Sequence, residues 1–299
     1  HAVPKEVLKP TSPISVTAKD KIQKEQTTVK IDSNQSLDKV RQSTLLPNEA
    51  MGTGGMVVSD NALASKIGME VLKEGGDAVD AAIATTLALG VLQPFASGIG
   101  GGGFAVVYRK DQQYALDFRE VAPAAATSDM YLDEQKEPIK GKSTIGALAA
   151  GVPEEVAGLY ELHKRHGKLP WKRLVQPALI LARDGFPMHK LLFKRTNSSI
   201  QRVQLSAQLS ESLLDQGVAK PLGTLVRFLN LGRTLQAIAD QGMAGFYEGK
   251  VALEIIKSIG EAKGIITEQD LKNYRVKSRA VISGEYHGYT ILSMPPPSS

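Results

Sequence analysis

The stretch from Asp77 to Leu92 constrains the fold more than any other part of this 299-residue chain. Its residues after Asp80 are uncharged and mostly apolar, and Gly75-Gly76 and Pro94 bound it on its two sides. The uncharged part is too short to cross a bilayer, so we predict a buried core helix and no membrane span. A helix that is apolar over most of its surface needs other layers packed around it.

The segments on either side of this helix predict how the layers begin. Before it, apolar residues from Leu63 to Val71 recur with the period of a helix, and Asp60 is expected to cap that helix. After it come two strand-like runs, 104–108 and 114–118, with a polar segment between them. This pattern predicts a β-hairpin.

The rest of the chain is predicted to hold a helical block and then closing strands. Thr267 and Asp270 have the spacing of a capping box at the start of a short helix. Further helices are expected over 153–166, 170–183, 231–241 and 249–262, and strands over 280–283 and 289–294. The order of these elements indicates an α+β fold with layered helices and sheet.

Residues 1–49 are expected to form a mobile leader, and residues 50–299 the folded region. The leader is rich in Lys, Ser, Thr, Gln and Pro and shows no sustained period. The net charge of the whole chain is only +5, so no nucleic-acid partner is expected. The first residue is His1 rather than Met, which favours an exported protein, periplasmic or extracellular.

The run ASGIGGGGF, Ala96 to Phe104, matches the dinucleotide-binding pattern G-x-G-x-x-G. A dinucleotide loop follows a strand and opens a helix, whereas here a buried helix precedes the glycines and a strand-like run follows them. No cofactor is therefore expected. We expect the glycines to allow positive φ angles or the close approach of a backbone or ligand. The residues concerned are Gly98, Gly100, Gly101, Gly102 and Gly103.

A collinear set of motifs extends over most of the chain. The motifs are GGDAVDAAIATTLALGVLQPFASGIGGGGFAVVY, LDFREVAPAAA, GVPEEVAGLYELHKRHGKLPWKRLVQPALILARDGF, FYEGKVALEIIKSIGEAKGIITEQDLKNYRVKSRAVISGEYHGY and the terminal SMPPPSS. Together they resemble the large subunit of the gamma-glutamyltranspeptidases, a family of gamma-glutamyltransferases and glutathione hydrolases. The resemblance covers roughly residues 50–299, is weak over 190–230 and leaves out residues 1–49.

The resemblance implies an N-terminal nucleophile hydrolase fold, a four-layer αββα sandwich that is incomplete in this chain. It also implies a precursor that cleaves itself into a large and a small subunit, with the new N-terminal Thr of the small subunit as the nucleophile. This Thr attacks the amide of glutathione or another gamma-glutamyl donor and forms a gamma-glutamyl-enzyme. Water then gives hydrolysis, and an amino acid or dipeptide acceptor gives transfer.

The family's D-F-R-E motif corresponds to residues 117–120 of this chain. In the family, its Arg holds the α-carboxylate of the glutamyl group, so the resemblance implies that Arg119 binds substrate. A guanidinium suits this task because its planar fork can pair with both carboxylate oxygens. Taken from the residues alone, an internal ion pair of Arg119 with Asp117 or Glu120 is the simpler expectation.

No catalytic residue and no metal site are expected within this chain. It has no cysteine, its histidines lack a third ligand at a suitable spacing, and Ser298-Ser299 lies outside any G-x-S-x-G pattern. The nucleophilic Thr is expected downstream, so the chain by itself is expected to be inactive. The histidines considered are His163, His166, His189 and His287.

Two alternatives to this function stay open. One is a related amidase of the cephalosporin-acylase type, which would act on a different acyl group. Arg119 argues against it only in part. The other is a truncated, non-catalytic remnant that binds a partner or nothing.

Overall fold

Two helices open the part of the chain that the computed structural model describes, which is residues 50–298. The predicted leader, residues 1–49, lies outside it. Helix α2 (Ala62–Lys73) is capped by Asn61, whose side chain accepts hydrogen bonds from two N–H groups of the first turn. The prediction of Asp60 as the cap was therefore wrong by one residue, because the Asp60 carboxylate and carbonyl accept hydrogen bonds from Gln93 instead.

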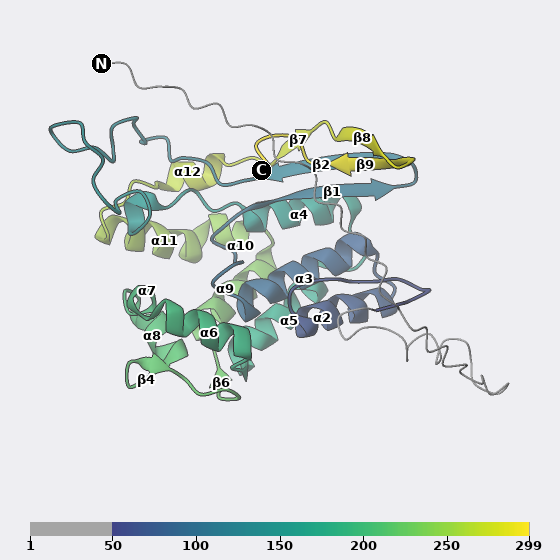
Figure 1. The fold of residues 1–299 in the computed structure, drawn as a ribbon, viewed down its shortest axis with the longest axis horizontal. Coiled ribbons are helices and arrows are strands. Elements are labelled where there is room, and N and C mark those ends of the chain that lie inside the picture. Colours follow the sequence, from purple (N-terminus) through teal and green to yellow (C-terminus); the bar gives the residue numbers. More distant parts are fainter. Residues whose placement is uncertain (1–49, 299) are drawn as a thin grey trace, which may run out of the picture. The chain divides into compact units, whose positions relative to one another are not determined.

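Helix α3 (Ala78–Leu92) is the buried helix that the sequence predicts. Asp77 caps it, and Asp77 and Asp80 form a reciprocal capping box. Most of its side chains are buried, with Ile83 and Leu87 at 0% and 3% exposure, and only one stripe, which includes Ala78 and Ala82, is exposed. The helix therefore acts as a central layer against which other elements pack (Figure 1).

Strands β1 (Gly103–Arg109) and β2 (Gln112–Phe118) form the predicted hairpin. Lys110 and Asp111 form its two-residue turn, and both have positive φ. This geometry matches the right-handed twist of the paired strands. A third strand that the sequence did not predict, β7 (Lys277–Arg279), pairs antiparallel with β2, which gives the sheet order β1-β2-β7.

The helical block follows the predicted order, with additional short elements over the segment that resembled the family least. Helix α4 (Glu155–His166) lies under the hairpin (Figure 1), and its Gly158 packs directly against the Phe118 ring. Thr267 and Asp270 form the predicted capping box at α12. The elements are η1 (Ala147–Ala149), α4 (Glu155–His166), α5 (Trp171–Asp184), β3 (Phe186–Pro187), α6 (Lys190–Ser198), α7 (Ile200–Val203), α8 (Ala207–Leu213), β4 (Leu214–Asp215), β5 (Val218–Ala219), β6 (Leu225–Val226), α9 (Leu229–Gln241), α10 (Ala244–Tyr247), α11 (Gly249–Glu261) and α12 (Glu268–Asn273).

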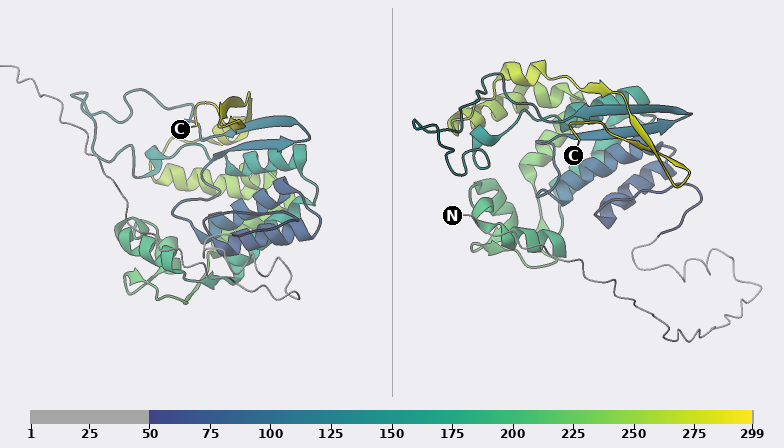
Figure 2. Two further views of the ribbon diagram at one scale, coloured as in Figure 1. Left: turned by 45° about the vertical axis from the view of Figure 1, so that its right-hand side comes forward. Right: turned by 45° about the horizontal axis from the view of Figure 1, so that its top comes forward.

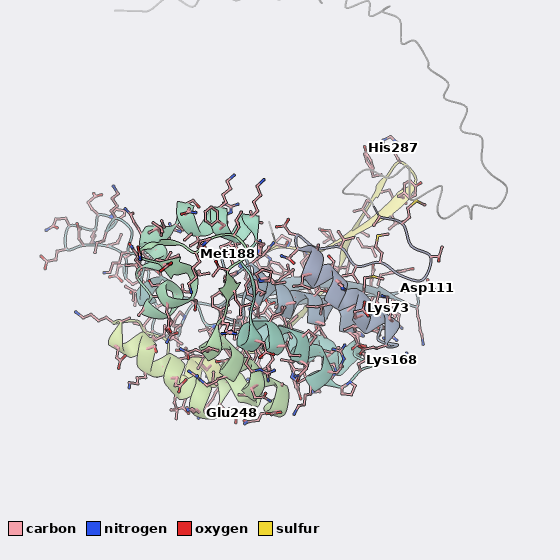
Figure 3. The ribbon with its side chains drawn as sticks, turned by 90° about the horizontal axis from the view of Figure 1, so that it is seen from below. Lys73, Asp111, Lys168, Met188, Glu248 and His287 are labelled. Carbon is pink, nitrogen blue, oxygen red and sulfur yellow. The ribbon has the colours of Figure 1, made fainter. Side chains whose placement is uncertain are left out.

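A second hairpin closes the described chain. It consists of β8 (Ile282–Tyr286) and β9 (Tyr289–Ser293), so the first of the two predicted closing strands lies two to three residues further along the chain than expected. His287 occupies its tip (Figure 3). Tyr286 and Tyr289 are 67% and 73% exposed, so this hairpin presents aromatic side chains to solvent.

The layers follow one order in Figure 1 and in Figure 2: the hairpin β1–β2, then α4, then α2 and α3. One hydrophobic core joins these layers to α5 and α9, with Leu174 and Ile238 fully buried between them. The α+β organisation predicted from the sequence is confirmed. Among the described residues, no helix combines the length and the apolar character that crossing a bilayer requires.

Candidate functional site

The glycine run forms the loop between the buried helix α3 and strand β1. Gly98 has a φ of +155°, and a Cβ added to Gly90 of α3 would lie 3.1 Å from the Gly98 Cα, so the loop passes directly over the helix. A helix precedes the loop and a strand follows it. This is the reverse of the order in which a helix N-terminus faces a bound pyrophosphate.

The loop also caps helix α4. The carbonyl oxygen of Gly101 accepts hydrogen bonds from the N–H groups of Glu154 and Glu155, at 2.8 Å and 2.9 Å. These N–H groups at the helix N-terminus would otherwise lack a partner, because no side chain caps this helix. The glycine run therefore fixes where α4 begins.

Gly102 is the glycine of the run that its surroundings restrict most. An added Cβ would overlap the carbonyl oxygen of Phe118, and it would lie 3.1 Å from the Glu120 nitrogen and 3.2 Å from the Glu154 Cβ. By contrast, a Cβ at Gly100 would meet nothing within 4 Å. Close backbone approach therefore restricts Gly102 but not Gly100.

A hollow of about 450 Å³ lies beside the glycine run. The Glu120 and Glu155 side chains line it together with the loop itself, so its polar wall is acidic. Glu155 also lines a second hollow of about 540 Å³, between α3 and β1. The loop residues at the first hollow are Pro94, Phe95, Ala96, Ser97, Gly98, Gly100, Gly101 and Gly102.

Arg119 lies where the chain leaves β2, beside this loop. Its side chain is 56% exposed, and its Nε is 3.4 Å from the Glu120 carboxylate. The guanidinium carbon is 5.9 Å from the centre of the Phe104 ring. Of the two internal pairings that the sequence left open, the one with Glu120 forms, and the one with Asp117 does not, because the Asp117 carboxylate binds Arg279. Among residues 50–298, the two terminal nitrogens of Arg119 make no hydrogen bond and can therefore receive an anion.

Glu154 and Glu155 are buried carboxyl groups that sequence analysis did not identify. They are 0% and 7% exposed, although acidic residues in a first helical turn usually face solvent. Within the described part of the chain, neither carboxyl oxygen of Glu154 has a hydrogen-bond partner. The only sequence signal for them is a pair of acidic residues directly after Pro153.

Burial raises the pKa of both groups. The pKa of Glu154 is raised to about 9, an effect that the charges of Glu120 and Asp117 reinforce and that the Lys277 ammonium opposes. Burial, with the Glu120 charge, raises the pKa of Glu155 to about 7. The protonated forms are neutral and are therefore easier to keep out of water.

These shifts predict that the folded protein loses stability as pH rises from about 4.5 to about 9. Between the usual carboxyl pKa of 4.5 and the raised values of about 7 and 9, the folded state binds more protons than the unfolded state. The free energy of unfolding should then fall as pH rises, by up to about 1.4 kcal/mol per pH unit for each group. In Glu154→Gln this slope should be smaller, as urea midpoints at pH 5, 7 and 9 would show. The exposed control Glu254→Gln should keep the wild-type slope, and an unchanged slope in Glu154→Gln would contradict the prediction.

All four histidines considered have structural contacts. His163 Nε2 pairs with the Leu169 carbonyl at 2.8 Å, and His189 Nε2 pairs with the Leu92 carbonyl at 2.9 Å. The His166 ring lies 4.7 Å from the Tyr114 ring, centre to centre. His287 is at the tip of the β8–β9 hairpin (Figure 3), where its ring lies 4.2 Å from the Tyr286 ring, centre to centre. Residues 50–298 contain no group of three or more His, Cys, Asp or Glu side chains placed to hold a metal ion.

Comparison with known proteins shows which family this chain resembles in sequence and fold. Residues 64–299 match the family model of the gamma-glutamyltranspeptidases. "Glutathione hydrolase 2" of Arabidopsis thaliana is 44% identical over 246 residues, which is 82% of this chain and 42% of that protein. The "Glutathione hydrolase proenzyme" of Escherichia coli K12 is 41% identical over 247 residues, 82% of this chain and 43% of that protein. The chain thus spans less than half the length of these relatives.

Solved structures agree with the sequence matches. The gamma-glutamyltranspeptidase of Helicobacter pylori superposes with a TM-score of 0.81 at 39% identity, over 84% of this chain and 72% of that one. The cephalosporin acylase of Bacillus halodurans has a TM-score of 0.73 at 29% identity, over 85% of this chain and 49% of that one. The fold is that of the N-terminal nucleophile hydrolases, and the chain belongs to the gamma-glutamyltranspeptidase family.

Proposed function

We propose that this chain supplies the donor-binding part of a gamma-glutamyltransferase and glutathione hydrolase. The observation that carries the proposal is the position of Arg119 in the D-F-R-E motif, exposed at the end of β2, with its terminal nitrogens unpaired within residues 50–298. A guanidinium fork in this state can bind the α-carboxylate of a gamma-glutamyl group through two parallel hydrogen bonds.

In the proposed reaction, Arg119 fixes the donor while a Thr nucleophile acts on it. The Thr is expected on a small subunit cut from the same precursor, in sequence outside these 299 residues. Its hydroxyl oxygen bonds to the γ-carbonyl carbon, the amide C–N bond breaks, and the amine leaves with the proton. Water or an amino-acid or dipeptide amine then attacks the ester and releases glutamate or the transfer product.

A comparison of three p-nitroanilides tests the proposal on the complete, processed protein. We expect kcat/KM to be highest for the gamma-glutamyl compound, which carries both the α-carboxylate and the α-ammonium group. The 4-aminobutyryl compound lacks the carboxylate and should react most slowly, by roughly 30-fold or more, because Arg119 is left unpaired.

Other results of the same comparison would support one of the two alternative functions, an amidase of the cephalosporin-acylase type or a non-catalytic remnant. A glutaryl compound keeps the carboxylate but lacks the ammonium group, so a preference for it over the gamma-glutamyl compound would favour an amidase of the cephalosporin-acylase type. If a complete and processed protein hydrolyses none of the three, the chain is part of a non-catalytic remnant and the proposal fails.

A further inference from the structure

Few contacts fix the position of the Arg119 side chain. Its contacts in the described part of the chain are the Glu120 carboxylate, 3.4 Å from Nε, and the face of the Phe104 ring, 5.9 Å from the guanidinium carbon. The side chain is also 56% exposed. Where the guanidinium lies must therefore depend largely on where the backbone of Arg119 is held.

The backbone of Arg119 is held by Asp117. Strand β2 ends at Phe118, and the Asp117 Oδ1 accepts a hydrogen bond from the Arg119 N–H at 3.0 Å. Asp117 is only 4% exposed, so its carboxylate is a fixed, buried group rather than a mobile surface one. A hydrogen bond from N–H to carboxylate two residues back directs the chain as it leaves the strand.

Arg279 in turn holds Asp117. Its Nε and Nη2 donate to the Asp117 Oδ2 at 3.0 Å and 2.7 Å. Arg279 comes from β7, the strand that pairs with β2, and it is 162 residues away in sequence. Charge-assisted bonds of this kind to a buried carboxylate are among the stronger contacts in a protein.

We propose that the Asp117–Arg279 ion pair is a positioning device that aims Arg119 at the donor carboxylate. The inference rests on the proposed function of Arg119. Asp117 and Arg279 touch no substrate in this scheme and act only through the backbone of Arg119. A purely structural pair would hold β7 to β2 and affect stability, but its effect on donor use would not depend on Arg119.

A double-mutant cycle on the complete, processed protein tests the proposal. In Asp117→Asn the amide oxygen still accepts from the Arg119 N–H, but the charge that holds Arg279 is lost. We expect kcat/KM for gamma-glutamyl-p-nitroanilide to fall roughly tenfold, since a displacement of about 1 Å in a binding group can cost about a hundredfold. In the Arg119→Ala background, Asp117→Asn should cause no further fall.

The control is Arg173→Gln, which breaks an ion pair between α5 and the residue after α2, with the Arg173 Nε 2.7 Å from the Glu74 carboxylate. Arg173 is as exposed as Arg279, at 33% against 35%, but its partner Glu74 is 45% exposed, whereas the Asp117 side chain is 5% exposed. Arg173→Gln should leave kcat/KM unchanged. Wild-type kcat/KM in Asp117→Asn, or an equal fall with and without Arg119, would overturn the proposal. If Asp117→Asn does not mature, Arg279→Gln replaces it in the same cycle, and Arg279→Lys should recover part of the loss.

Failure of this inference differs from failure of the proposed function. If Arg119→Ala alone keeps wild-type kcat/KM, the function proposed for Arg119 is wrong. If Arg119→Ala reduces kcat/KM but the Asp117 and Arg279 variants do not, only the positioning role is wrong.

Discussion

Replacing Arg119 with alanine in the complete, processed protein should lower kcat/KM for gamma-glutamyl-p-nitroanilide roughly 30- to 5,000-fold. The substitution leaves the donor carboxylate without its charge-assisted partner, which costs about 2–5 kcal/mol where the pair is shielded from water. At about 1.4 kcal/mol for each factor of ten, that cost gives the stated range. The lower end applies if the site stays as open to solvent as the 56% exposed Arg119 side chain is in this structure.

A second variant separates the contribution of the positive charge of Arg119 to donor binding from that of its planar shape. Arg119→Lys keeps the positive charge but loses the planar fork, so its kcat/KM should fall between those of the wild type and Arg119→Ala. Steady-state kinetics measure this, with a gel to show that both variants still cleave themselves. Self-cleavage should survive because Arg119 is proposed to act on the substrate alone.

The matched control for Arg119 is Arg183. Its side chain is 55% exposed and, like that of Arg119, it pairs with the acidic residue that follows it, Asp184. Arg183→Ala should therefore keep wild-type kcat/KM. A normally processed Arg119→Ala enzyme with near-wild-type kcat/KM would remove Arg119 from donor recognition.

The sequence predicts best those elements whose signals are local. Helix α3 has an acidic capping box at its start and apolar residues throughout, and the β1–β2 hairpin has a polar turn between two strand-like runs. Each signal lies within a few residues of the structure it specifies. The Asp60 cap was misplaced because Asn61, next to it, can accept the same hydrogen bonds.

Strand β7 shows why other elements could not be predicted. Its residues, Lys277, Ser278 and Arg279, are polar and show no alternation of apolar side chains. They form a strand because β2 offers them an edge to pair with, and β2 is far away in the sequence. Pairing of this kind depends on tertiary contacts that local propensity does not record.

In the candidate site, too, some residues could be predicted from the sequence and others could not. Arg119 follows from the resemblance of one short motif to its family, but the partner of Asp117 does not, because Arg279 is 162 residues away. Four other basic residues precede Arg279 in the same charged segment, and only the pairing of β7 with β2 selects it. These four are Lys263, Lys272, Arg275 and Lys277.

The burial of Glu154 is equally hidden from the sequence. Acidic residues at the start of a helix are expected to face solvent, where they also interact favourably with the helix dipole. Nothing in the local pattern distinguishes Glu154 from such a residue. Its burial results from the glycine loop, in which the Gly101 carbonyl accepts the Glu154 N–H and Gly102 packs against the Glu154 Cβ.

Replacing Gly102 with alanine should prevent correct folding and self-cleavage. A Cβ at this position overlaps the Phe118 carbonyl oxygen and lies 3.1 Å from the Glu120 nitrogen. Both are backbone atoms at the end of β2, where Gly103 pairs with Phe118, so they cannot move without disturbing the hairpin. Overpacking of side chains costs about 1–3 kcal/mol. An overlap with backbone atoms that cannot move should cost more and approach the roughly 5–15 kcal/mol that stabilises a typical protein.

Gly100→Ala is the matched control, because a Cβ there meets nothing within 4 Å and the residue belongs to the same loop. It should give wild-type soluble yield, self-cleavage on a gel and urea midpoint, whereas Gly102→Ala should lose all three. If both variants fold and cleave alike, close backbone approach does not explain the glycine at position 102. If Gly102→Ala does fold, the shifted backbone at Glu120 should also displace Arg119, so kcat/KM for the donor should still fall while that of Gly100→Ala stays unchanged.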